Sequence, residues 1–68
     1  MREDIDMNTF DNYVTTLTEL ASRCLFKSNS AAEREIKKID AEITHLYGED
    51  ALEQIKSRVR NNISRVFG

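Results

Sequence analysis

The sequence predicts an all-α fold, a three-helix bundle with helices over residues 8–26, 31–47 and 50–66. Three observations support this prediction. Apolar residues recur every three or four positions in three separate segments, as on one face of an α-helix. Clusters of residues that favour caps and turns separate these segments, at 28–30 and 48–50. The chain contains no proline and only two glycines, so little interrupts a helix.

The first helix is expected over residues 8–26, after a flexible acidic tail of residues 1–7. Asn8 or Thr9 supplies an oxygen that can cap its free N–H groups. Segment 14–18 is rich in β-branched residues, which also suit a strand. The apolar period near 3.5 nevertheless continues through Phe10, Tyr13, Val14, Leu17, Leu20, Ala21, Cys24 and Leu25. This period favours a helix. Cys24 lies on the apolar stripe and is expected to be a small buried residue.

The second helix is expected over residues 31–47. Ser30 with Glu33 three positions later matches a capping box. The apolar residues follow a spacing of 4, 3, 4 and 3, which places them in one stripe. They are Ala32, Ile36, Ile39, Ile43 and Leu46. This stripe is the centre of the predicted fold, because the two other helices must cover it.

The third helix is expected over residues 50–66. Gly48 ends the helix before it, since glycine adopts a positive φ without steric cost. Asp50 and Glu53 repeat the capping-box spacing. The connection has only about two residues and is too short for a flexible linker. The expected core residues are Leu52, Ile55, Val59, Ile63 and Val66. Residues 8–68 therefore form a single domain.

Length and charge limit the function classes. A chain of 68 residues is near the lower limit for folding on one hydrophobic core, and its single cysteine excludes an intrachain disulfide. Residues 1–50 carry 11 acidic and 6 basic residues, whereas residues 51–68 carry 1 and 4. No apolar run reaches the ~18 residues of a membrane span, and the acidic N-terminus differs from a secretory signal. We expect no membrane partner and a cytoplasmic location, in a cell or in a host cell.

No group of side chains has the spacing of a catalytic, cofactor or metal site. One His and one Cys are too few for a metal centre. The only glycines, Gly48 and Gly68, cannot form a glycine-rich phosphate loop. We therefore predict that the chain is not an enzyme and holds no cofactor or metal.

Two short segments resemble known motifs. Residues 34–43 are similar to the first helix of the all-helical chorismate mutases, in which an arginine binds a substrate carboxylate, but Ala51 stands near the place of that family's next arginine. The turn at Gly48 is similar to that of the DNA-binding helix-turn-helix family. Glu49, Gln54 and Ser57 occupy positions that are apolar in that motif. Neither resemblance is extended to the function of the chain.

Surplus apolar residues indicate an interface with another protein. The apolar arc of the first helix spans about 140°, wider than the ~100° stripe of a helix that faces one core. Ile5, Met7, Phe26, Tyr47 and Phe67 lie at helix ends, where a small core has little room. The candidate partner-binding residues are Phe26, Tyr47, Phe67 and Tyr13. The main hypothesis is a small interaction module of the regulator, inhibitor or chaperone type that also forms a homo-oligomer.

Nucleic-acid binding is the alternative function. Gln54, Arg58, Asn61 and Arg65 share the face of the third helix that lies opposite the predicted core. Arginine, asparagine and glutamine side chains supply the usual contacts to phosphates and base edges. The isoelectric point of about 5.3 differs from the basic footprint of most nucleic-acid-binding domains, so this partner ranks second.

Overall fold

A computed structural model describes residues 5–27 and 29–67, except for the side chains of Phe26, Val66 and Phe67. The chain forms three helices, α1 (Met7–Phe26), α2 (Ser30–Leu46) and α3 (Glu49–Phe67), and the described residues contain no strand. The predicted all-α three-helix bundle is confirmed, and each predicted helix boundary lies within one residue of the observed one. Residues 1–4 of the predicted tail lie outside the described residues.

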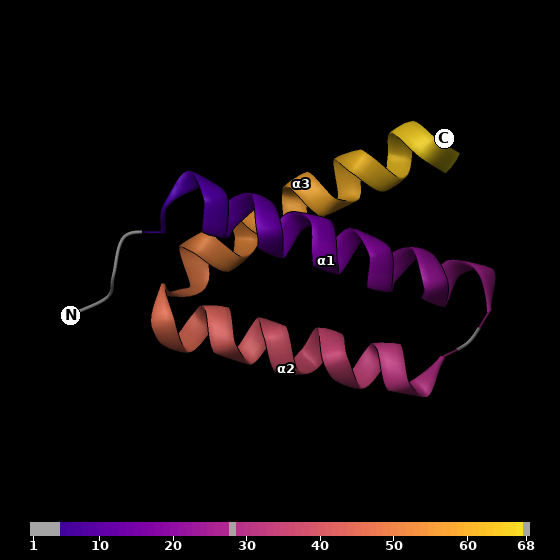
Figure 1. Cartoon of the computed structure of the whole chain (residues 1–68), viewed down its shortest axis with the longest axis horizontal. Coiled ribbons are helices and arrows are strands. Elements are labelled where there is room, and N and C mark those ends of the chain that lie inside the picture. Colours follow the sequence, from indigo (N-terminus) through magenta and orange to yellow (C-terminus); the bar gives the residue numbers. More distant parts are fainter. Residues whose placement is uncertain (1–4, 28, 68) are drawn as a thin grey trace.

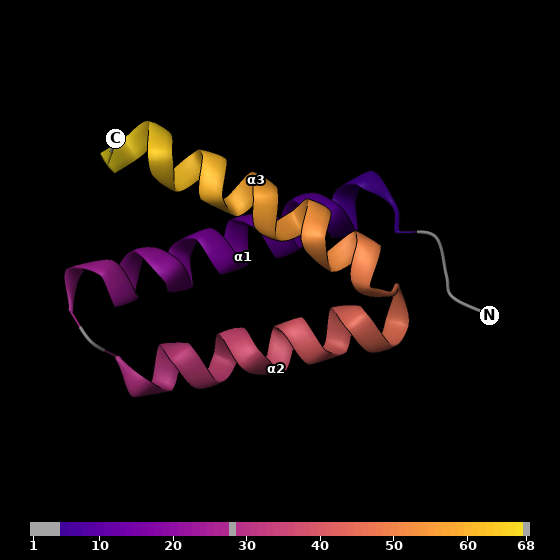
Figure 2. The same cartoon turned by 180° about the vertical axis from the view of Figure 1, so that it is seen from behind.

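The helices form a bundle that is closed at one end and open at the other. Helices α1 and α2 run antiparallel, and α3 crosses α1 at an angle (Figure 1). Helices α2 and α3 meet at a short turn and then diverge, so that the start of α2 and the end of α3 lie on opposite sides of α1 (Figure 2). The molecule measures 39 × 24 × 17 Å, and its radius of gyration is 12.0 Å. Scaling with chain length gives about 10.9 Å for a compact domain of this size, so the bundle is slightly expanded.

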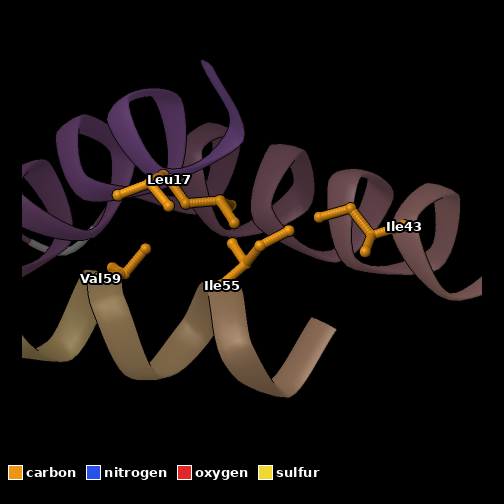
Figure 3. Close-up of a cluster of buried hydrophobic side chains, with 5 residues drawn as sticks. Leu17, Ile43, Ile55 and Val59 are labelled. Carbon is orange, nitrogen blue, oxygen red and sulfur yellow. The ribbon is translucent and has the colours of Figure 1, made fainter. Parts of the chain in front are cut away.

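The core is a small cluster to which all three helices contribute. Five buried residues pack together, namely Val14, Leu17, Ile43, Ile55 and Val59. Ile43 and Ile55 have no exposed surface, and both lie near the α2–α3 turn. Four of these side chains converge between the helices (Figure 3). Burial of each such side chain contributes about 1.5–3 kcal/mol, so these few residues provide much of the hydrophobic stabilisation.

The start of α1 differs from the prediction. Asp6 caps the helix, because its side chain accepts a 2.7 Å hydrogen bond from the Thr9 N–H, whereas Asn8 and Thr9 lie inside the helix. This hydrogen bond lowers the pKa of Asp6 below its ordinary value of 3.8. Several neighbouring residues could serve as caps. With Asp6 as the cap, Ile5 packs against the core cluster, and local sequence alone does not reveal this contact.

The predicted caps of α2 and α3 also differ from the structure, because both residues lie inside their helices. Asn29 caps α2 and accepts a 3.1 Å hydrogen bond from the Ala32 N–H, so Ser30 is the first helical residue rather than the cap. Helix α3 begins at Glu49, and the predicted cap Asp50 lies in its first turn. Acidic residues are favourable there because the N-terminal end of a helix carries partial positive charge.

The α2–α3 turn confirms the predicted role of Gly48. This glycine is buried and has a φ of 101°, and its N–H donates to the carbonyls of Ile43 and Thr44, each at 3.1 Å. A side chain on Cβ would be strained in this conformation. The turn contains only Tyr47 and Gly48, which holds the end of α2 against the start of α3.

Three predictions of burial are wrong. Leu46 is 41% exposed and Leu25 is 61% exposed, although both were expected in apolar stripes. Cys24 is only half-buried, and its thiol lies 4.0 Å from the carbonyl oxygen of Asn29. Because the helices diverge, they do not cover the last turn of α1. Tyr47, the residue after Leu46, packs against the core cluster instead.

Candidate functional site

A groove opens where α2 and α3 diverge. It has a volume of about 280 Å³, and residues from all three helices line it. Leu17 and Ala21 of α1 form its floor, Ile36 belongs to the α2 wall, and Val59 and Ile63 belong to the α3 wall. Ala21, Ile36 and Ile63 are only half-buried. The groove is therefore an apolar surface that the three helices leave incompletely covered.

An ion pair lies within this groove. The Lys56 ammonium of α3 is 3.1 Å from Oδ2 of Asp40 on α2, and Asp40 retains 20% of its side-chain exposure. The other carboxylate oxygen of Asp40, Oδ1, is buried and has no hydrogen-bond partner. A buried acceptor without a donor is unfavourable, and a carboxylate oxygen forms strong bonds with charged donors. Asp40 therefore has one oxygen paired with Lys56 and one buried oxygen without a hydrogen-bond partner.

Arg60 lines the same groove from α3. Its side chain is exposed, and within the described residues it forms no ion pair. A guanidinium group carries five N–H donors in a planar arrangement that suits carboxylates. The groove thus combines apolar side chains, the Asp40–Lys56 ion pair and one cation that has no carboxylate partner in the described part of the chain.

The two tyrosines predicted to bind a partner have intramolecular contacts. The Tyr13 hydroxyl donates a 2.9 Å hydrogen bond to Oε2 of Glu42, and the Tyr13 and Tyr47 rings meet edge to face, with centroids 6.3 Å apart. Burial, together with this hydrogen bond, raises the pKa of Tyr13 to about 12. Both rings are half-buried against the core and tie α1 to α2.

The two predicted phenylalanines cannot be placed in the same way. The side chains of Phe26 and Phe67 lie outside the described part of the structure, although their backbones end α1 and α3. Of the four candidate partner-binding residues, the structure describes the side chains of Tyr13 and Tyr47, and it brings these two together.

The predicted polar face of α3 is present. Gln54, Arg58, Asn61 and Arg65 are all exposed, and in the described part of the structure neither arginine forms an ion pair. Arg65 also borders a depression between α1 and α3, together with Thr15, Thr18, Glu19 and Asn62. The Thr18 hydroxyl is buried there without a partner.

The polar residues of the groove were absent from the sequence prediction. Asp40 lies on α2 between two residues of the apolar stripe, Ile36 and Ile43. A charged residue on this stripe could have indicated a polar contact between the helices. Its partner Lys56 is 16 positions away in the chain, so only the packing of α2 on α3 reveals the ion pair.

The comparisons with known proteins found no relative of this chain. No protein-family model matches the chain, and neither a curated protein nor a solved structure matches it. None of the helices in the described ranges is long and apolar enough to cross a membrane. Residues 5–27 and 29–67 also contain no group of three or more His, Cys, Asp or Glu that could hold a metal ion.

Proposed function

We propose that this chain is a small non-enzymatic protein–protein interaction module whose groove between α2 and α3 receives an apolar helix from another polypeptide. The observation that carries this proposal is the groove itself, with its half-buried Ala21, Ile36 and Ile63. A fourth helix placed between α2 and α3 would contact both and cover α1. This arrangement corresponds to a four-helix bundle, and an amphipathic helix in an apolar groove is a common mode of recognition.

The size of the groove favours a helix over a small-molecule substrate. Its volume of about 280 Å³ is just below the range of about 300–1,000 Å³ that is typical of ligand pockets. The side chains that line it include no Ser, Thr, Cys or His, the usual nucleophiles and bases of such sites. The proposal includes the cytoplasm of a cell or of a host cell as the location, since a single cysteine suits a reducing compartment.

The test compares the wild-type chain with a variant in which the groove is filled. Ala21→Trp places a large ring on the groove floor, and Thr16→Trp adds the same ring at an exposed position of α1. Each tagged protein is used to capture partners from extracts of the native host, after circular dichroism shows that it is folded. A captured protein is then identified, purified and titrated by calorimetry.

We expect the wild type and Thr16→Trp to bind the same purified partner, and Ala21→Trp to bind it at least about tenfold more weakly, because the ring occupies the anchor position. Equal affinity of all three proteins for that partner would contradict the proposal.

Nucleic-acid binding is a second candidate, supported by the exposed arginines of α3. From residue 54 to residue 65 the helix carries four basic residues and no acidic one. Of these four, Lys56 alone forms an ion pair within the described part of the chain. Phosphate binding through such residues weakens steeply as the salt concentration rises.

The double variant Arg58→Glu/Arg65→Glu should abolish any salt-sensitive binding of the chain to DNA or RNA in a fluorescence anisotropy titration. Unchanged binding would rule out this face.

A further inference from the structure

We propose that the helix that enters the groove belongs to a different protein and carries an Asp or Glu side chain that pairs with Arg60, three or four residues from the apolar side chain that fills the groove. This inference rests on the proposed function, because it gives the chemistry of the occupant of the same groove. It depends on Arg60, since this exposed cation lies beside apolar side chains.

The groove is charged toward the closed end of the bundle and apolar toward the open end. On α2, Asp40 lies nearer to the α2–α3 turn than Ile36 does. On α3, Lys56 and Arg60 lie nearer to this turn than Ile63 does. A rise of 1.5 Å per residue separates Lys56 from Ile63 by about 10 Å along α3, or about two helical turns. An entering helix therefore contacts charged side chains at one end of the groove and apolar side chains at the other.

Arg60 gives the groove a net positive charge. The side chains that line the groove include three charged residues, Asp40, Lys56 and Arg60. The Lys56 ammonium lies 3.1 Å from Oδ2 of Asp40, so these two charges balance each other. Arg60 is exposed and forms no ion pair in the described part of the chain. A charged group from another molecule can therefore reach the guanidinium.

A helix that covers the groove removes water from Arg60. A guanidinium that loses water without gaining a partner is unfavourable, and a carboxylate that forms two hydrogen bonds with it replaces the lost contacts. A neutral helix in the same place would leave the charge unpaired, and a basic helix would add repulsion. We therefore expect the occupant to present an Asp or Glu side chain to Arg60.

The spacing of the groove residues determines where this carboxylate lies in the entering helix. Arg60 and Ile63 are three residues apart on α3, so their Cβ atoms are about 5–6 Å apart on one face. A helix that packs along this wall has to present an acidic and an apolar side chain at a similar separation, which corresponds to three or four residues. Ala21 is small and half-buried beside the groove, which leaves room for the apolar side chain.

The surface of a second copy of this chain fits this description less well than a foreign acidic helix does. The exposed large apolar residues, Met7, Leu25 and Leu46, lie at or next to helix ends rather than along one helix face. The groove wall on α3 of a second copy would place another Arg60 against the first. The wall on its α2 carries Asp40, whose carboxylate is already paired within the same copy. The charges therefore favour a different protein.

The experiment selects helical peptides that bind the full chain, from a displayed library of peptides of about 18 residues. Each peptide has leucines at one-turn intervals along one face, and every other position is Ala, Gln, Glu or Lys. Peptides that bind the wild type but not a folded Ala21→Trp variant need the groove. Among these peptides, we expect Glu to be at least about threefold more frequent than Lys at a position three or four residues from a leucine.

One selected peptide is then titrated by fluorescence anisotropy. Arg60→Glu should weaken its binding at least about tenfold, because this change places two carboxylates together. A peptide in which Lys replaces the enriched Glu should bind Arg60→Glu more tightly than it binds the wild type, since both charges of the pair are then reversed. The matched control is Arg34→Glu, the same charge change at an exposed residue of α2 that does not line the groove. We expect this control to change the affinity by less than about twofold.

Two results of these measurements would overturn the inference and leave the proposed function in place. One is no preference for Glu over Lys among peptides that need the groove, and the other is equal weakening by Arg60→Glu and Arg34→Glu. Sedimentation velocity provides a third, because a wild-type dimer that Ala21→Trp abolishes would show that a second copy occupies the groove. If no peptide distinguished the wild type from Ala21→Trp, the groove would not accept a helix, and the proposed function would fail as well.

Discussion

The two ends of the bundle are built from similar amphipathic helices and nevertheless differ in packing. At the closed end, Ile43 and Ile55 are fully buried beside the Gly48 turn. At the open end, Ile36 and Ile63 are only half-buried, because α2 and α3 diverge there and do not cover each other. The short turn holds α2 and α3 together at one end only. The comparison indicates that Ile43 and Ile55 are buried where the Gly48 turn joins α2 to α3, whereas Ile36 and Ile63 keep exposed surface where these two helices diverge.

The largest expected effect separates the two ends directly. Ile55→Ala should lower the free energy of unfolding by about 3 kcal/mol, because it leaves a cavity at a site with no exposed surface. Ile63→Ala makes the same change at the open end, where the neighbours cover less of the side chain, and should cost about 1 kcal/mol or less. Urea unfolding followed by circular dichroism measures both values. Similar losses for the two variants would show that the ends are equally packed.

A smaller effect is expected from the turn that closes the bundle. Gly48→Ala places a Cβ at a φ of 101° and should destabilise the fold by about 1–2 kcal/mol. Gly48→Asn serves as the control, since asparagine tolerates positive φ better and should cost less. The same urea unfolding assay applies. If alanine and asparagine were tolerated as well as glycine, the conformation of this turn would not hold the closed end together.

The smallest effect concerns the hydrogen bond between α1 and α2. The pKa of Tyr13 is raised from 10.0 to about 12 in the folded chain, so the protonated hydroxyl is favoured by folding. This contribution is fully present below pH 10 and is lost as the pH rises from about 10 to about 12. In Tyr13→Phe the stability should be lower at neutral pH by less than about 1 kcal/mol.

The stability of Tyr13→Phe should also fall less steeply above pH 10 than that of the wild type. Thermal unfolding between pH 8 and pH 12 measures both curves. Parallel curves for the two proteins would show that Tyr13 does not titrate as expected.

Much of the architecture could be predicted from local sequence. The apolar period gives the number and extent of the helices, and Gly48 gives the position of the tight turn, because each depends on neighbours within a few residues. The caps were less predictable. Asp6 and Asn29 compete with adjacent residues that have equally suitable side chains, and packing of residues such as Ile5 decides between them.

The candidate site could be predicted only in part. The exposed polar face of α3 followed from helix geometry, because its members share one helix. The groove could not be predicted, because its floor, its two walls and its ion pair come from three helices. Tyr13 and Tyr47 were predicted to bind a partner, and their edge-to-face contact was not foreseen because it depends on how α1 packs on the end of α2.

Helix periodicity and glycine stereochemistry act over a few residues, so the order of the amino acids specifies three amphipathic helices, the turn at Gly48 and the exposed arginines of α3. Which parts of the apolar stripes are buried depends instead on how the three helices pack. The angle between α2 and α3 is set by side-chain packing across the whole bundle, and this angle places Asp40 and Arg60 beside one groove.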